Sequence, residues 1–151
     1  MQSNTCCFLG HRRITETAEL REVLTNTIEN LITIKNVNTF LFGSKSQFDK
    51  LCLELVSALK HKHPHIKRVY VRAEYPIINE DYESYLLKHY DETYYPPDIL
   101  GSGKTVYIKR NYEMIDKSQF CIVHYIEDSY KSGTKIALSY AIKRNKEIYY
   151  L

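Results

Sequence analysis

TCCFLGHRR, residues 5–13, is the stretch that decides the fold predicted for this chain. Cys6 to Leu9 form a continuous apolar run, as expected for a parallel-sheet strand that is buried on both faces. Gly10 permits a turn directly after this strand, since glycine has no Cβ. A helix is predicted from Thr15 onward, with Thr15 or Thr17 as its N-cap. A strand, a basic turn and a helix N-terminus predict an anion site, because unpaired N–H groups and the helix dipole point outward there.

The rest of the chain alternates apolar residues at helical spacing with short apolar runs of strand length. The predicted helices are 15–35, 46–63, 81–90, 104–117 and a last one that opens at Gly133. The predicted strands after the first are 38–42, 66–73, 92–95, 119–125 and 147–151. Strands that alternate with helices indicate right-handed crossovers and a mainly parallel sheet in a three-layer α/β/α arrangement. In such sheets ligands bind beyond the carboxyl ends of the strands, near the point where the strand order changes.

Length and composition limit the class of protein. With 151 residues and no internal repeat or linker, residues 1–151 are predicted to form one domain with a real core. Lys and Arg exceed Asp and Glu by only 21 to 18, which argues against a nucleic-acid-binding surface. No apolar run approaches the roughly 20 residues that span a bilayer. No signal-peptide pattern opens the chain either, so a cytoplasmic protein without membrane contact is expected.

The cysteine and histidine patterns predict neither a disulfide nor a metal site. The cysteines lie in apolar runs without a C-x-x-C pair, which favours reduced, buried thiols at Cys6, Cys7, Cys52 and Cys121. The histidines at positions 61, 63 and 65 have no Cys or acidic partner nearby, so a solvated surface is the preferred interpretation. No cofactor is predicted.

Four segments, in this order, resemble the SLOG superfamily, and most closely its small stand-alone members with a Gly-His-Arg opening, the DUF1273-like group. They are residues 6–12 (CCFLGHR), 43–49 (GSKSQFD), 109–116 (KRNYEMID) and 132–134 (SGT) with Tyr140-Ala141. Each lies at a predicted strand-to-helix junction or on a helix beside one. The resemblance covers essentially the whole chain and implies a Rossmann-like nucleotide-binding fold. Relatives in that superfamily are the LOG-type phosphoribohydrolases, DprA-like DNA-processing proteins and the SLOG domains of Thoeris-type antiphage effectors, which bind cyclic ADP-ribose-like signals.

The residues of these segments suit a phosphorylated ligand. Glycine at positions 10 and 43 allows close backbone approach to a phosphate, Arg12 can fork onto its oxygens, and Lys45 adds a compact charge. Gly133 and Thr134 offer N–H groups and a hydroxyl at a further helix N-terminus. The predicted ligand-binding residues are Gly10, His11, Arg12, Gly43, Ser44, Lys45, Phe48, Asp49, Arg110, Asn111, Met114, Ser132, Gly133, Thr134 and Lys135. Tyr75 and Tyr125 are the candidates for stacking on a base.

Several of these residues also have a structural interpretation. His11 either contacts the ligand or only hydrogen-bonds the turn. Arg12, expected at the buried edge of the glycine turn, needs an anionic partner, which is either the ligand or a protein carboxylate. Asp49 is expected to cap or pair near its own loop rather than to catalyse. Phe48 and Met114 are expected in the core, with the pocket floor as the alternative.

One departure from the family pattern argues against catalysis. LOG-type hydrolases carry Gly-Gly-x-Gly-Thr-x-x-Glu, and the related nucleoside deoxyribosyltransferases carry Ser-Gly-Thr-x-x-Glu. Here residues 132–137 read SGTKIA, so Ala137 occupies the position of the glutamate. Cleavage of an N-glycosidic bond needs a group that stabilises or traps an oxocarbenium-like centre, and alanine cannot do so. The carboxylates left as substitutes are Asp49, Glu74, Asp116 and Asp128.

The preferred hypothesis is therefore a binding module for a nucleotide-derived signal of the ADP-ribose, cyclic ADP-ribose or cyclic-nucleotide type. It would act as a sensor or as a sequestering sponge, for instance in phage–host immunity, and as a homodimer or larger homo-oligomer. The first alternative is a nucleotide N-glycosidase of the LOG type. The second is DprA-like single-strand DNA binding, which predicts an affinity that falls steeply with salt.

Overall fold

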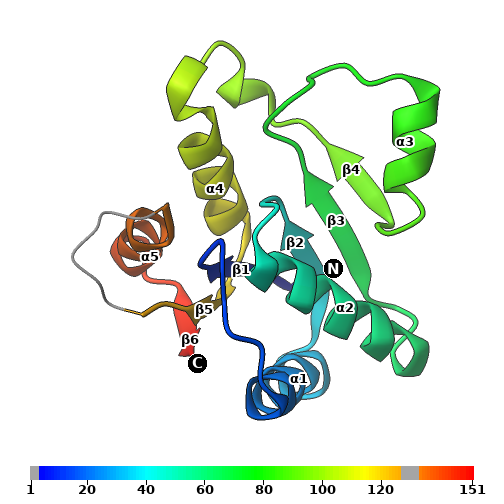
Figure 1. Cartoon of the computed structure of the whole chain (residues 1–151), viewed down its shortest axis with the longest axis vertical. Helices are drawn as coiled ribbons and strands as arrows, with labels where there is room; N and C mark the ends of the chain where they lie inside the picture. Colours follow the sequence, from blue (N-terminus) through cyan, green and yellow to red (C-terminus); the bar gives the residue numbers. More distant parts are fainter. Residues whose placement is uncertain (1–3, 127–132) are drawn as a thin grey trace.

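The computed structural model describes residues 4–126 and 133–151, and within them six strands form one sheet (Figure 1). The strands are β1 (Asn4–Gly10), β2 (Val37–Phe42), β3 (Lys67–Val71), β4 (Glu92–Tyr94), β5 (Phe120–His124) and β6 (Glu147–Tyr150). Their order is β4-β3-β2-β1-β5-β6, and each neighbouring pair is parallel. The predicted α/β fold with a parallel sheet is confirmed.

Helices cover both faces of the sheet. They are α1 (Ala18–Thr33), α2 (Gln47–Lys62), α3 (Glu80–Leu86), α4 (Val106–Lys117) and α5 (Gly133–Lys143), with short 3₁₀ turns at Pro97–Ile99 and Gly103–Thr105. α1 and α2 pack together over one face, and α4 and α5 pack together over the other (Figure 1). Each face of the sheet has its own hydrophobic core, and the central strand β1 contributes to both. Cys6 and Phe8 belong to the core under α1 and α2, and Cys7 and Leu9 belong to the core under α4 and α5. The continuous apolar sequence of β1 follows from this double burial.

The order of the strands places a crevice beside β1. The chain runs outward from β1 through β2 and β3 to β4, and then returns through α4 to β5 on the other side of β1. β1 therefore pairs with both β2 and β5. In open parallel sheets such a reversal separates the loops that leave the two neighbouring strands, and ligands bind in the gap.

Most element boundaries differ from the sequence prediction by one to a few residues, and three differences have a clear local cause. α1 is capped by Thr17, whose hydroxyl accepts a hydrogen bond from the Leu20 amide at 3.1 Å, so it starts later than Thr15. The predicted helix 81–90 ends at Leu86, because the Asp91 amide donates to the carbonyl of Arg68 and leads the chain into β4. The segment after Pro97, predicted as a loop, contains the two 3₁₀ turns.

Two sequence expectations concern burial and membranes. All four cysteines are buried and unpaired by disulfides, as predicted. Among the helices in residues 4–126 and 133–151, none combines the length and apolar character that crossing a bilayer requires.

Candidate functional site

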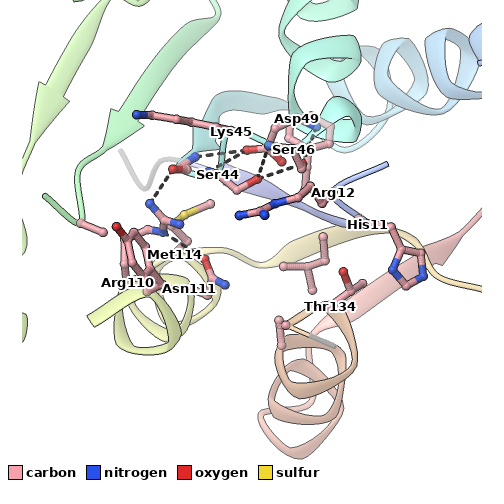
Figure 2. Close-up of a pocket in the computed structure, with 18 of the residues that line it drawn as sticks. His11, Arg12, Ser44, Lys45, Ser46, Asp49, Arg110, Asn111, Met114 and Thr134 are labelled. Carbon is pink, nitrogen blue, oxygen red and sulfur yellow. Dashed lines mark hydrogen bonds between the residues drawn. The ribbon is translucent and has the colours of Figure 1, made fainter. Parts of the chain in front are cut away.

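A pocket of about 930 Å³ opens at the carboxyl ends of the strands, where the strand order changes. Its walls come from the ends of β1, β2 and β3, from α4, and from the start of α5 (Figure 2). The volume lies within the range of about 300–1,000 Å³ that is usual for small-molecule sites. The pocket thus has the position that the sequence predicted for a ligand.

Most of the predicted site residues line this pocket. They are Gly10, His11, Arg12, Gly43, Ser44, Lys45, Asp49, Tyr75, Arg110, Asn111, Met114, Gly133 and Thr134. Phe48, Lys135 and Tyr125 do not line it. Ser132 lies outside the described residues. Five chain segments that are far apart in sequence are therefore brought to one cavity.

The loop from β2 to α2 is closed by Asp49. One of its carboxylate oxygens accepts hydrogen bonds from the amides of Gly43 at 3.3 Å and Ser44 at 3.1 Å. Ser46 caps α2 by accepting from the Asp49 amide at 3.1 Å. The amides predicted to hold a phosphate thus already have a protein acceptor, and a phosphate site in this loop stays a prediction. Asp49 has the structural role expected for it.

Burial sets the electrostatics of Asp49 and Arg110. Desolvation raises the pKa of Asp49 to about 6, although its two backbone hydrogen bonds and the nearby Arg110 charge favour the ionised form. Desolvation also lowers the pKa of Arg110. Arg110 donates through Nη1 to the carbonyls of Gly43 and Val71 and through Nε to the Asn111 side chain at 3.0 Å (Figure 2). It therefore ties α4 to the ends of β2 and β3 and forms a rigid pocket floor.

The two strand-end glycines are required by protein packing. A Cβ on Gly10 would lie 2.1 Å from Cδ2 of Phe48, and one on Gly43 would lie 2.7 Å from Sδ of Met114. Phe48 is fully buried and packs edge-on against Phe8, so it belongs to the core beneath the pocket. The expected reason for these glycines, close approach of a phosphate, is replaced by close approach of Phe48, Arg110 and Met114.

Arg12 is one of three exposed cations that line the pocket and have no side-chain hydrogen bond or ion pair among the described residues, the others being Arg13 and Lys45. The exposure of Arg12 corrects the expectation of a buried-edge arginine. Figure 2 shows its side chain reaching into the space between the Ser44–Asp49 loop, α4 and α5. No residue of α1 lines the pocket, so the dipole of α1 plays no part there. The start of α5, which was also predicted to favour an anion, does line the pocket through Gly133 and Thr134.

His11 holds the pocket rim together. Its Nε2 accepts a hydrogen bond from the amide of Ile126 at 2.9 Å, and its ring lies 5.2 Å from that of Tyr125. This bond requires an unprotonated Nε2, which places the ring proton of the neutral imidazole on Nδ1. His11 was predicted either to contact the ligand or only to hydrogen-bond the turn. The structure contains a hydrogen bond within the pocket rim, and His11 also lines the pocket.

The sequence analysis named Tyr75 for the aromatic part of the pocket but missed Tyr70, Tyr82 and Tyr107. These three residues line the pocket together with Tyr75 and Glu74. The sequence analysis named Glu74 only as a possible substitute for the family glutamate. Its position just after β3 was the signal that could have placed it in the pocket. The two tyrosines on helices carried no local motif, since only the fold turns them toward the cavity.

Of the other carboxylates named as possible substitutes for the family glutamate, Asp49 lines the pocket and Asp116 does not. Asp116 accepts from the hydroxyl of Tyr140 and pairs with Arg144, and Asp128 lies outside the described residues. Ala137, at the position of the family glutamate, does line the pocket. Within the described parts of the chain, no three His, Cys, Asp or Glu side chains gather as a metal site would require.

No family model matches the chain. It is 29% identical over 143 residues to the uncharacterized SPbeta prophage-derived protein YoqJ of Bacillus subtilis (strain 168), covering 83% of this chain and 81% of that protein. Membership of the SLOG superfamily is not shown by these matches.

Two solved structures of the molybdenum cofactor (Moco) carrier protein of Chlamydomonas reinhardtii resemble the whole chain. One superimposes with a TM-score of 0.54 at 16% identity, covering 100% of this chain and 77% of the carrier. The other gives a TM-score of 0.55 at 16% identity, with 99% and 76% covered. Identity this low is informative about architecture only. The chain therefore has the Rossmann-like α/β fold that these carrier proteins have.

Proposed function

We propose that this protein binds a phosphorylated, nucleotide-derived small molecule in the pocket at the carboxyl ends of its strands. The observation that carries the proposal is Arg12, an exposed guanidinium that points into a large cavity without a protein partner among the described residues. Arginine is suited to phosphate because its planar fork matches two oxygens at once.

A helix N-terminus supports the same end of the pocket. Gly133 and Thr134 line the cavity at the start of α5. The first amides of a helix lack partners within the helix and carry its positive dipole end, so they favour an anion beside Arg12. This proposal does not use the amides of Gly43 and Ser44, which Asp49 occupies.

Binding without turnover agrees best with the carboxylates of the pocket. Asp49 is held by two amides, and Ala137 offers no acid or nucleophile at the family position. We therefore propose a sensor or sequestering protein for a signal of the ADP-ribose, cyclic ADP-ribose or cyclic-nucleotide type. It would act in the cytoplasm as a homodimer or larger assembly. The prophage origin in the name of the Bacillus relative supports a role between phage and host.

Mass spectrometry of small molecules released from the denatured protein, followed by calorimetric titration with AMP, ADP-ribose and cyclic ADP-ribose, tests this proposal. The Arg12→Ala variant should lose affinity by roughly 10- to 100-fold, as expected for a charged hydrogen-bonding pair. The matched control is Arg144→Ala, because Arg144 pairs with Asp116 and does not line the pocket. Retention of affinity in Arg12→Ala would contradict the proposal.

Two other outcomes would replace the proposal with one of its alternatives. Release of free base from any of these nucleotides would identify a nucleotide N-glycosidase, in which Glu74 is the remaining pocket carboxylate. Binding of single-stranded DNA whose affinity falls steeply between 50 and 200 mM salt would identify a DprA-like protein. The Arg12→Ala and Arg144→Ala proteins serve as controls in both assays.

A further inference from the structure

The pocket has two chemically different ends. Arg12 and Thr134 come from the β1 loop and α5, at the side of the sheet where β5 lies. The opposite end is lined by residues from β3, α3 and the first turn of α4. These are Glu74, Tyr70, Tyr75, Tyr82 and Tyr107. A ligand that fills the cavity would meet a cation at one end and aromatic rings with a carboxylate at the other.

Tyr75 has an unfavourable backbone conformation that positions it at this end. Its φ is 59°, in the left-handed region that a bulky side chain rarely adopts. The side chain of Arg72 holds it there by donating to the carbonyls of Tyr75 at 3.2 Å and Pro76 at 3.4 Å. The residue remains 58% exposed, so the strain is not compensated by burial in a core. Strain of this kind gathers at functional sites.

Two further rings and one carboxylate complete the aromatic end. Tyr82 contacts the Tyr75 ring edge-on at a centroid distance of 6.0 Å. The hydroxyl of Tyr107 donates to Glu74, and the Arg110 guanidinium lies 5.9 Å from the centre of the Tyr107 ring. Glu74 is therefore oriented by Tyr107 through one oxygen. As an ionised carboxylate it has acceptor capacity left, and it can pair only with donors.

We propose that Glu74, Tyr75, Tyr82 and Tyr107 form a subsite for a bicyclic base that carries an exocyclic amino group. The inference rests on the proposed function, in which Arg12 holds the phosphate of the same ligand. Exposed tyrosine rings stack on planar heterocycles, and a carboxylate accepts from an amino group but repels a ring carbonyl oxygen. The donor edges that fit are those of adenine and of guanine-like rings.

Two matched pairs of nucleotides test the amino group. AMP differs from purine riboside 5′-monophosphate, and GMP from IMP, only by an amino group. In the wild-type protein we expect the amino-bearing member of one pair to bind roughly tenfold more tightly, because a site that pairs with a donor rejects the analogue lacking it. Tighter binding of AMP than of purine riboside 5′-monophosphate would identify adenine as the base of the ligand. Tighter binding of GMP than of IMP would identify a guanine-like base. Glu74→Gln keeps one neutral acceptor oxygen and should reduce the preference, whereas Glu74→Leu has no acceptor and should abolish it.

Ribose 5-phosphate separates this inference from the proposed function. Its affinity should fall in Arg12→Ala but stay unchanged in Glu74→Gln and Tyr75→Gly, because it has no base. Tyr75→Gly should weaken AMP binding while it keeps or raises the unfolding temperature, since glycine relieves the positive φ. A tyrosine with only a structural role would give a lower unfolding temperature instead.

Three results would overturn the subsite. The first is equal affinity within both nucleotide pairs. The second is phosphocholine binding as tight as that of AMP, which would make the rings a cage for a quaternary ammonium group. The third is ribose 5-phosphate binding that the base does not improve, which would leave the proposed function intact. If neither ribose 5-phosphate, the mononucleotides nor ADP-ribose binds, the proposed function itself fails.

Discussion

The loops that follow β1 and β2 have similar sequences and different structures. Each starts with a glycine after a buried strand and has a basic residue two positions later, in residues 10–12 and 43–45. Residues 43–46 lead directly into α2 and are closed by Asp49. Residues 11–17 form a longer loop before α1, and the charge of Arg12 stays available to a ligand.

The difference comes from one position in the following helix. Asp49 is the third residue of α2, next to the Ser46 cap, and its carboxylate reaches back to the two loop amides. The third residue of α1 is Leu20, which has no such group. The amides of a glycine turn before a helix are therefore open to a bound anion only if no carboxylate of that helix already accepts from them. A carboxylate three residues after the cap is the sequence signal to check.

The largest expected effect is on the closed loop. Asp49→Ala leaves the buried amide of Gly43 and the part-buried amide of Ser44 without an acceptor, which should lower the free energy of unfolding by about 2–5 kcal/mol. Asp49→Asn keeps one acceptor oxygen and should cost less. Urea denaturation at pH 7 measures both variants. Equal losses in the two variants would show that these amides do not depend on Asp49.

The next effect is the pH dependence of the same loop. The folded-state pKa of Asp49, about 6, lies above its ordinary value of 3.8, so folding favours the protonated acid. The resulting stability is fully present below about pH 4 and is lost as the pH rises through 6. The wild type should lose up to about 3 kcal/mol relative to Asp49→Asn over this window. A stability difference that is constant with pH in denaturation series would contradict the buried environment.

A smaller effect is expected from packing at the end of β1. Gly10→Ala forces the new Cβ against Phe48, and overpacking of this kind costs about 1–3 kcal/mol. Gly133→Ala is the matched control, because no atom of residues 4–126 and 133–151 lies within 4 Å of its added Cβ. Thermal unfolding of both variants checks this. The double variant Gly10→Ala/Phe48→Leu should recover part of the loss, since the two positions are in contact. Full additivity would argue against the contact.

The smallest effect on stability is expected at the open loop. Arg12→Ala removes no side-chain hydrogen bond or ion pair among the described residues, and Arg12 is exposed, so the unfolding free energy should change by less than about 0.5 kcal/mol. Ligand affinity should fall in the same variant. If Arg12→Ala instead destabilised the protein as much as Asp49→Ala does, the two loops would be equivalent and the comparison would fail.

Local patterns in the sequence determined the framework and part of the site. The double burial of β1, the alternation of strands and helices, and the position of the pocket beyond the strand ends all follow from residue periodicity and strand order. Gly10, Arg12, Gly43 and Thr134 were found because they lie at strand-to-helix junctions. Such junctions are readable because hydrophobic period and turn chemistry act over a few residues.

Only the tertiary structure decided how those residues are used. It showed that Phe48 occupies the space above Gly10, that Asp49 takes the amides of the β2 loop, and that α1 begins too late to face the pocket. It also brought Tyr82 and Tyr107 beside Glu74. These contacts join residues from separate helices and loops, and no local pattern encodes which side chains will meet once the sheet and its two helical layers have packed.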